Sequence, residues 1–552
     1  MGRGPFSFTP FKSNEFHGGY GSIQGEDVVL QREHTFSSTM ELNTHEDQSQ
    51  KQQRSFDFDH VTSEEFNFES VQPPKKFSFQ ETKGQKDKQV LPSSLASLEL
   101  LSNYGRRFNK IGTQNIRCSV ETCFSPQKLS TEEIIRVAGA RYLQHSTQWH
   151  HDLCIPMHPY GMSLGVLSEE ENRGVELAQF LLAAAERVGC QQFERASMLL
   201  SHLLWNSSGG GGSPVERVVV FHFSQALLER IKRETSGKVT LNKCVKNEER
   251  EMIEKLRLDT NMALTCHEKI PFNQVMQFSG VQAIVEHVAF QTRIHLINLD
   301  IGCGVQCTAL MQALAERHER QVELLKITAI GLQGKTRLEE TGKRLVSFAE
   351  SLNLPFLYKI VFVRSITEIK AEQFGIEDNE AVAVYSPYML RTMVSDFVSL
   401  EHLMRVMRKI RPTIMIVLEL EAKHNSPSFV NRFIEALFFY AAFFDCIDTC
   451  MKQDYECRMR LEGILSEGIR NIVAMEDGER RVRDVKIDVW RRFFARYSMV
   501  ETAFSESSLY QANLVTKKFE CGNFCTVERN GKCLILGWKG ATIHSISAWK
   551  FL

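Results

Sequence analysis

A regular alternation of strand-like and helix-like segments between residues 294 and 418 constrains this 552-residue chain more than any other feature. Short apolar runs predict strands, and apolar residues at helical spacing predict helices. The predicted strands span 294–299, 324–330, 356–363, 381–385 and 413–418, and the predicted helices span 308–317, 337–352 and 397–410. Such alternation requires a mostly parallel sheet with helices on both faces. We therefore expect a doubly wound, Rossmann-like α/β core within residues 291–552.

A long helical region precedes the first predicted strand. The stretches with apolar residues at helical spacing are 131–143, 175–205, 215–231 and 275–290. They predict a helical cap, formed by about residues 131–290, ahead of the α/β core. Near the C-terminus, short runs at 532–538 and 543–548 resemble strands and predict antiparallel additions to the edge of the sheet.

Residues 1–130 are expected to form a mostly disordered regulatory tail. Its first 90 or so residues are rich in Gln, Ser, Glu, Lys and Asp, and phenylalanine supplies almost all of the apolar content, which is too little to offset chain entropy. A Phe-x-Phe unit recurs at 6–8, 56–58, 66–68 and 77–79. These units are either docking motifs for coregulators or an accident of composition. A short amphipathic helix is expected over 93–101.

Charge and cysteine usage exclude several classes of protein. The net charge is -1 and the isoelectric point is about 7.0, so the chain as a whole is not an electrostatic nucleic-acid binder. Its 14 cysteines are scattered through apolar segments and predict free thiols in a reducing compartment, the cytosol or the nucleus. No secretory leader and no membrane-spanning segment are expected.

The segment from Asp300 to Gly304 has the form of a cofactor-binding turn. It follows the first predicted strand, precedes a helix and contains Gly302, and glycines there let the backbone approach a ligand at the helix amides. Asp-x-Gly-x-Gly also resembles the first motif of S-adenosylmethionine-dependent methyltransferases. Such cofactors need a carboxylate at the end of the second strand, but that strand leads into Leu332 and Gln333. We therefore favour an architectural turn and expect no bound cofactor.

Other candidate sites also have ordinary structural explanations. His424 and Asn425, near Glu419 and Glu421, could supply acid–base chemistry, or they could form a turn and cap a helix. The cysteine pairs 303/307 and 521/525 lack the spacing of a zinc ribbon, so no metal is expected. Arginines at 480, 481 and 483 could touch phosphate or aid nuclear import, but we expect a solvated surface. We expect the tryptophans at 490, 538 and 549 to pack in the core.

Taken in order, these segments resemble the five-part signature of the plant GRAS family over about residues 175–552. The leucine-rich helices at 175–231 match the first part, and 294–300 is similar to the family's Val-His-Ile-Ile-Asp motif. The segments 355–358 and 421–429 match the Pro-Phe-Tyr-Arg-Glu region, and two tryptophan-containing motifs close the chain. The residues that carry the resemblance are Leu177, Leu181, Leu199, Leu203, His295, Asn298, Asp300, Pro355, Phe356, Tyr358, His424, Asn425, Trp538 and Trp549.

The resemblance implies a nuclear transcriptional regulator with a helical cap over a methyltransferase-like core. Whether the protein is also present in the cytoplasm stays open. The resemblance implies no catalysis, and it makes the residues above candidates for contacts with DNA-binding transcription factors and other GRAS chains. Direct DNA binding stays open. The alternative is a methyltransferase or small-ligand sensor that uses Asp300, Gly302 and Gly304. The chain departs from the family at Asn298, Cys307 and Tyr385, and it lacks the Asp-Glu-Leu-Leu-Ala motif of the DELLA branch.

Overall fold

The computed structural model describes residues 97–104, 129–147, 167–207, 215–236 and 259–552, except 477. The Phe-x-Phe units and most of the expected tail and linker lie outside these residues. Within them, the helix expected over 93–101 is present at 97–104.

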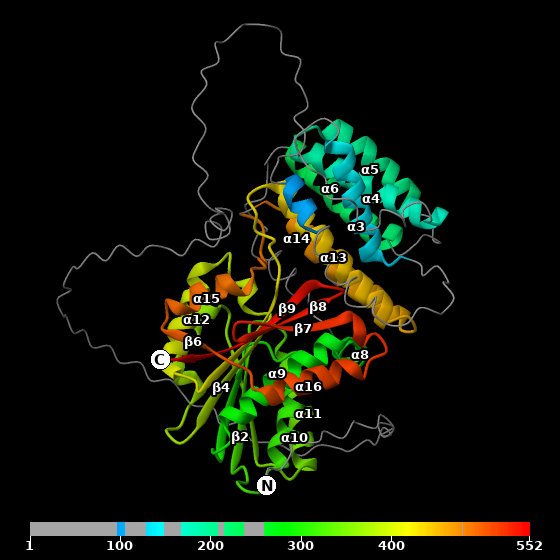
Figure 1. The fold of residues 1–552 in the computed structure, drawn as a ribbon. Coiled ribbons are helices and arrows are strands. Elements are labelled where there is room, and N and C mark those ends of the chain that lie inside the picture. Colours follow the sequence, from blue (N-terminus) through cyan, green and yellow to red (C-terminus); the bar gives the residue numbers. More distant parts are fainter. Residues whose placement is uncertain (1–96, 105–128, 148–166, 208–214, 237–258, 477) are drawn as a thin grey trace, which may run out of the picture. The chain divides into compact units, whose positions relative to one another are not determined.

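One mixed sheet forms the centre of the fold, and it confirms the expected Rossmann-like α/β class (Figure 1). Its strand order is β3-β2-β1-β4-β5-β9-β8-β7, with β6 paired to β9. The first five strands are parallel, whereas β9 runs antiparallel to β5. The strands are β1 (Arg293–Asn298), β2 (Leu324–Gly331), β3 (Phe356–Phe362), β4 (Ala381–Pro387), β5 (Ile414–Leu420), β6 (Met499–Thr502), β7 (Cys525–Asn530), β8 (Cys533–Trp538) and β9 (Ala541–Phe551). The order reverses between β1 and β4, where doubly wound sheets bind ligands.

Helices cover both faces of the sheet, as its parallel part requires. Figure 1 shows α9, α10, α11 and α16 on one face and α12 and α15 on the other. The helices are α8 (Thr260–Lys269), α9 (Pro271–His287), α10 (Val305–Ala315), α11 (Lys335–Ser351), α12 (Phe397–Ile410), α15 (Ile487–Ala495) and α16 (Glu506–Lys517), with short 3-10 turns η4 (Ile366–Glu368), η5 (Ala371–Phe374), η6 (Leu390–Thr392) and η7 (Gly522–Phe524). Gly280 allows close contact of α9 with the sheet, because an added Cβ would lie 3.2 Å from Ile416 Cγ2.

A helical layer packs beside the core. It contains α3 (Thr131–Thr147), α4 (Glu169–Gly189), α5 (Phe193–Ser207), the π-helical turn η3 (Val215–Val220), α6 (Phe221–Thr235), α13 (Phe429–Cys450) and α14 (Tyr455–Val473). Its composition differs from the expected 131–290, because α13 packs on α3 and α4, and α14 packs on α6, whereas α9 packs on the sheet. The reason is that α13 is apolar on most sides and is buried by the helical layer and by β9 together.

Local sequence explains where the leucine-rich helices begin and end. Ser168 and Glu171 form a capping box at the start of α4: Ser168 Oγ accepts from the Glu171 amide at 3.2 Å, and the Glu171 carboxylate accepts from the Ser168 amide at 2.8 Å. Gly189 ends α4 against α13, because an added Cβ would lie 2.6 Å from Val430 Cγ2. The break expected near Gly189 is therefore present.

Candidate functional site

The glycine turn between β1 and α10 contains two glycines with different structural roles. Gly302 and Gly304 both have positive φ angles, +56° and +80°, which favour glycine. An added Cβ at Gly304 would lie 3.1 Å from Thr341 Cγ2 of α11, whereas one at Gly302 would meet no atom within 4 Å. Gly304 is thus needed for packing between helices, while only Gly302 faces open space.

The turn is held by hydrogen bonds within the protein. Thr341 Oγ1 donates to the Gly302 carbonyl at 3.1 Å, and Gln306 Nε2 donates to the Ile301 carbonyl at 3.0 Å. The amide of Asp300, a half-buried residue, donates to Asn298 Oδ1 at 3.2 Å. The shape of the turn is therefore fixed by its neighbours in the fold.

The end of β2 lacks the acid that a nucleotide-type cofactor requires. The strand ends at Gly331, and the chain continues through Leu332 and Gln333 into α11. An added Cβ at Gly331 would lie 2.2 Å from Leu338 Cδ1 of α11. An apolar contact therefore stands where a carboxylate would hold ribose hydroxyls, so the described residues fit such a cofactor poorly.

Aromatic side chains fill the carboxyl end of β4. Tyr385 is buried, and its Cε2 atom would lie 3.1 Å from a Cβ at Gly280 of α9. Tyr388, which has φ +55°, contacts His544 Nδ1 of β9 through its hydroxyl at 3.2 Å. Burial, together with Arg391, lowers the pKa of His544 to about 3, so this imidazole is neutral. The β4 side of the switch point is thus packed against α9 and β9.

Two departures from the usual family residues lie against each other below the turn. Asn298 and Cys307 are both buried, and Asn298 Nδ2 lies 3.9 Å from Cys307 Sγ. Burial raises the pKa of the Cys307 thiol to about 12, which keeps it protonated. The pair therefore adds no charge beneath the turn.

His424 lies in a buried polar network rather than in an accessible catalytic site. Its Nδ1 donates to Asp484 Oδ2 at 3.1 Å, and Arg391 Nη1 donates to Asp484 Oδ1 at 2.7 Å. Asn425 Nδ2 donates to the Asp484 carbonyl at 2.9 Å, and Arg480 Nη1 donates to the His424 carbonyl at 2.7 Å. All five residues are more than half buried. Because they come from separate stretches of the sequence, the network joins distant segments of the chain.

Arg480 and Arg483 correct the expectation of a solvated basic stretch. Both are buried, since this segment packs under the polar network instead of facing water. Buried arginines cannot attract a nucleic acid at long range in the way that an exposed basic patch does. Arg480 and Arg483 therefore stabilise the fold and do not form a solvated basic surface.

Burial and the nearby charge of Arg391 together determine which carboxylates of this network are ionised. Burial acts to raise the pKa of Asp484, but Arg391 and the hydrogen bond from His424 together hold it below its ordinary value. Glu419 accepts from the amides of Leu390 and Arg391 at 3.0 and 3.2 Å. Burial nevertheless raises the pKa of Glu419 to about 8, with Arg391 opposing the shift. One carboxylate of the network is thus ionised, whereas Glu419 is largely protonated at neutral pH.

The raised pKa of Glu419 predicts a loss of stability at alkaline pH. A folded-state pKa of about 8, above the ordinary 4.5, gives a stabilising contribution that is complete below pH 4.5 and is lost as pH rises through 8. The urea midpoint should therefore fall between about pH 6 and about pH 8.5, and Glu419→Gln should flatten this fall. The exposed Glu339→Gln is the control. An unchanged pH slope in Glu419→Gln would refute the assignment.

His295, the histidine of the β1 motif, is also buried and structural. Its Nε2 lies 2.8 Å from Thr328 Oγ1 of β2, and its Nδ1 lies 3.2 Å from Glu380 Oε2, just before β4. Burial lowers the pKa of His295 to about 3, and Lys326 adds to this effect. The neutral imidazole therefore bridges β1 to β2 and to the start of β4.

The two tryptophans of the closing motifs are buried, as expected. Trp538 Nε1 donates to Asp445 Oδ2 of α13 at 2.6 Å. Trp549 Nε1 donates to Ser547 Oγ at 2.8 Å, and its ring centroid lies 4.5 Å from that of Phe494 in α15. Trp538 therefore joins the sheet to α13, and Trp549 joins it to α15.

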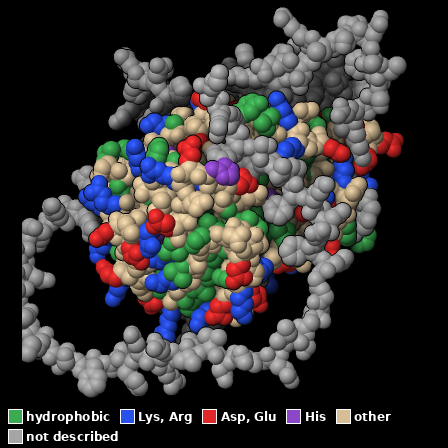
Figure 2. All heavy atoms as spheres, turned by 90° about the horizontal axis from the view of Figure 1, so that it is seen from below, with side chains coloured by type: hydrophobic (Ala, Val, Ile, Leu, Met, Phe, Trp, Pro, Cys, Tyr) green, Lys and Arg blue, Asp and Glu red, His purple; other side chains and the backbone are tan. Residues whose placement is uncertain are grey.

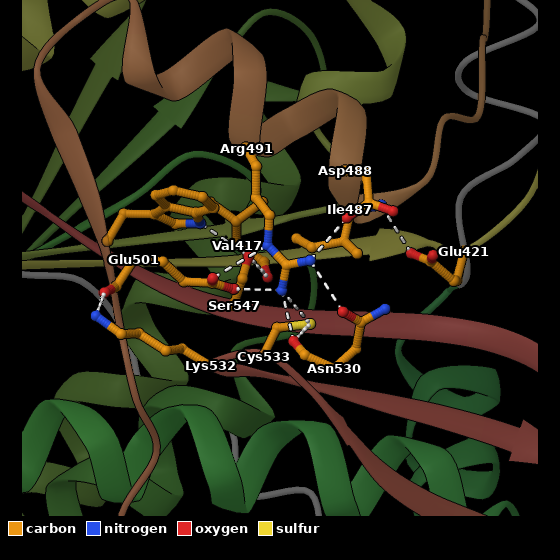
Figure 3. Close-up of polar contacts among 11 residues, drawn as sticks. Val417, Glu421, Ile487, Asp488, Arg491, Glu501, Asn530, Lys532, Cys533 and Ser547 are labelled. Atoms are coloured by element: carbon orange, nitrogen blue, oxygen red, sulfur yellow. Dashed lines mark hydrogen bonds and ion pairs between the residues drawn. The ribbon is translucent and has the colours of Figure 1, made fainter. Parts of the chain in front are cut away.

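Arg491 of α15 is a central residue that the sequence analysis missed. Figure 3 shows its guanidinium between β6 and the turn that joins β7 to β8. It forms a bidentate pair with Glu501, with both distances at 3.1 Å, and donates to Asp488 Oδ1 at 2.7 Å and Asn530 Oδ1 at 2.9 Å. The i, i+3 spacing of Asp488 and Arg491 was the only local sign of this role in the sequence, because Glu501 and Asn530 are more distant along the chain.

Comparison with known protein families shows to which family the chain belongs. The sequence model of the GRAS domain family matches residues 177–550, more than half of the chain. This chain belongs to the GRAS domain family. The match covers the α/β core except its last two residues, and most of the helical layer.

Individual GRAS relatives agree with this assignment. The chain is 28% identical over 386 residues to DELLA protein RGL1 of Arabidopsis thaliana, covering 70% of this chain and 72% of that protein. It is 29% identical over 391 residues to GRAS family protein RAD1 of Medicago truncatula, covering 68% of this chain and 73% of that one. The crystal structure of SCL7 from Oryza sativa has the same fold, with a TM-score of 0.56, 24% identity, and coverage of 68% of this chain and 99% of SCL7.

In this GRAS domain most of the signature leucines face inward. Leu177, Leu181 and Leu203 are buried, so these three pack the helices of the helical layer together and are not free to meet a partner directly, whereas Leu199 is half-buried. Their helical spacing marks the inner face, because the burial of apolar residues produces that spacing.

Apart from the half-buried Asp300 of the glycine turn, the remaining GRAS signature residues fall into two groups. Pro355 is exposed, and Phe356 and Tyr358 of edge strand β3 are half-buried, with Tyr358 donating to the Leu338 carbonyl at 3.0 Å. His295, Asn298, His424, Asn425, Trp538 and Trp549 are buried and therefore cannot contact a partner in this conformation. Most of the conspicuous motif residues thus build the fold.

The described residues contain neither a metal-binding cluster nor a membrane-spanning helix. No group of three or more His, Cys, Asp or Glu side chains there is arranged to hold a metal ion. In the same part of the chain, no helix has the length and apolar character needed to cross a membrane.

Proposed function

We propose that this GRAS protein is a nuclear transcriptional regulator, a coactivator or corepressor, that binds other proteins and catalyses no reaction. Its partners are DNA-binding transcription factors and other GRAS chains, as a homodimer or heterodimer, with coregulators meeting the N-terminal tail. The observation that carries the proposal is the switch point of a GRAS domain: β2 ends without a carboxylate, and Tyr385 packs the end of β4. A Rossmann-like core modified in this way supports binding surfaces rather than cofactor chemistry.

The outer side of α5 is the surface that best fits a protein partner. Met198 and Trp205 are 67% and 86% exposed, and a separation of seven residues places them on the same side of the helix, two turns apart. Exposed large apolar side chains mark interaction sites, and tryptophan is enriched among residues that dominate binding energy. The buried leucines behind them would keep this surface rigid.

Charge supports recruitment by transcription factors over direct contact with DNA. The net charge is -1, and Figure 2 shows Lys and Arg interspersed with Asp and Glu around apolar side chains on the face seen from below. A DNA-binding face needs clustered positive charge to release counterions. The proposal therefore does not require direct DNA binding.

Affinity purification from plant nuclei tests the proposal. The tagged full chain should enter the nucleus and recover transcription factors or GRAS chains, and Trp205→Ala should lower recovery about tenfold or more, because an exposed anchor residue contributes roughly 2 kcal/mol. Phe290→Ala, which removes another highly exposed aromatic ring, is the matched control and should have no effect. Exclusion from the nucleus, or equal recovery by all three chains, would refute the proposal.

A second candidate function is a methyltransferase or small-ligand sensor. It is favoured by the open space at Gly302, beside Asp300 and Gly304. The absent carboxylate at the end of β2 counts against it. Its first requirement is measurable binding of S-adenosylmethionine.

A further inference from the structure

Two cysteines that are distant in sequence meet at the end of α13. Cys450 is the last residue of α13, and Cys521 directly precedes η7, which leads into β7. Their sulfur atoms lie 3.1 Å apart, about 1 Å more than the length of a disulfide bond. Both are free thiols, with Cys450 half-buried and Cys521 buried. A small side-chain movement would therefore bring them to bonding distance.

We propose that Cys450 and Cys521 form a reversible disulfide under oxidising conditions, a modification that ties the helical layer to the C-terminal strands. The neighbouring Cys446 has its sulfur 3.9 Å from that of Cys450, but both lie on α13, one turn apart. Side chains one turn apart have Cβ atoms roughly 5–6 Å apart, whereas a disulfide needs about 3.5–4.5 Å. Cys521 is therefore the favoured partner of Cys450.

The protein already joins these segments through polar and ring contacts. Asp445 of α13 accepts from Trp538 Nε1 at 2.6 Å and pairs with Lys539 Nζ at 3.0 Å. Phe524, in η7, packs edge-on against Trp538, with ring centroids 5.6 Å apart. These contacts hold the backbone on either side of the two thiols, so forming the disulfide would need no rearrangement of elements. Figure 1 shows α13 reaching from the helical layer to the sheet.

The oxidation is balanced with a peroxide as oxidant. Hydrogen peroxide transfers one oxygen to Cys450, the more accessible thiol, giving a sulfenic acid and one water. The Cys521 sulfur then attacks the sulfenic sulfur, the S–O bond breaks, and a second water leaves as the S–S bond forms. Two thiols thus lose two electrons and two protons to one peroxide. A reducing thiol such as glutathione reverses the change by thiol–disulfide exchange.

The surroundings make this response slow. The hydrogen bond with Cys446, together with burial, raises the pKa of Cys450, although the bond with Cys521 opposes the shift. The hydrogen bond with Cys450, together with burial, raises the pKa of Cys521, so little thiolate is present at neutral pH. In a reducing compartment the pair would stay reduced, and it would close only during sustained oxidation.

Peptide mapping of the full chain tests this proposal. The reduced protein is treated with hydrogen peroxide, the remaining thiols are blocked with N-ethylmaleimide, and the digest is analysed by mass spectrometry. We expect a cross-linked peptide pair containing Cys450 and Cys521, with a mass about 2 Da below the sum of the reduced peptides, and its loss on adding dithiothreitol. The thermal midpoint should rise by about 5 °C, because the bond closes a long loop.

Variants separate this pair from its neighbours. Cys450→Ser and Cys521→Ser should abolish the cross-link and the thermal shift, whereas Cys446→Ser, the control on the same helix, should keep both. Oxidation of Cys450 to sulfinic acid without a cross-link, or a cross-link from Cys450 to Cys446 or Cys525, would overturn the proposal. Mapping the wild-type chain alone decides between these outcomes if a variant fails to fold.

Discussion

Replacing Arg391 with methionine is expected to lower the free energy of unfolding by about 3–5 kcal/mol. The substitution keeps an unbranched side chain, shorter than that of arginine, but removes the 2.7 Å ion pair with Asp484, leaving a buried carboxylate with His424 as its remaining side-chain partner. A buried charge that loses its counterion is strongly destabilising. Urea unfolding at neutral pH, followed by tryptophan fluorescence, measures the change.

The control for Arg391→Met is Arg405→Met on α12. Arg405 is 56% exposed and pairs with Glu401 one turn away, an arrangement that contributes about 0.3–0.5 kcal/mol. The control should therefore unfold almost like the wild type. If the two variants lost equal stability, or if Arg391→Met lost less than about 1 kcal/mol, the network around Asp484 would not have the structural role assigned to it.

Trp538→Ala is expected to remove about 3–5 kcal/mol of stability. The buried indole fills the junction between β8 and α13, and its removal leaves a cavity and takes one hydrogen-bond donor from Asp445. The same measurement of urea unfolding applies. Trp205→Ala, the same substitution on the exposed side of α5, should change stability by less than about 0.5 kcal/mol.

The two tryptophan variants separate folding from binding. We expect Trp538→Ala to lower the unfolding free energy, and Trp205→Ala to lower partner recovery while the fold stays intact. A loss of stability in Trp205→Ala as large as that in Trp538→Ala would contradict the assignment of α5 as an outward surface.

Much of the fold could be predicted because its central strands are buried on both faces. Burial on both faces produces continuous apolar runs, so the four inner parallel strands β1, β2, β4 and β5 were predicted to within a few residues. Edge strand β3 is less buried, but its apolar and aromatic residues still form a strand-like run. The helices α13 to α16 were not predicted. In α13 apolar residues lie on most sides, because the helix is buried by the helical layer and by the sheet, and this removes the one-sided pattern that identifies an amphipathic helix. Strand β6, four residues long, gives too short a pattern.

The location of the candidate site could be predicted from the sequence, but the packing and burial of its side chains could not. The glycines and strand order place the turn at the switch point, whereas its packing depends on Tyr385 meeting Gly280, a contact between residues far apart in the chain. The same is true of His424, whose partner Asp484 lies 60 residues away. Sequence spacing revealed the acid–base residue types but not the burial that makes them structural.

The central claim, a Rossmann-like GRAS core that binds proteins and no cofactor, is tested most directly by titration calorimetry with S-adenosylmethionine. We expect the purified full chain to give no heat of binding at micromolar ligand, with Gly302→Val and Asp300→Asn indistinguishable from it. Asp300→Asn keeps the size of the side chain and introduces no residue at a positive φ, so it remains informative if valine at position 302 disturbs the fold. Micromolar binding by the wild type that is lost in both variants would contradict the account.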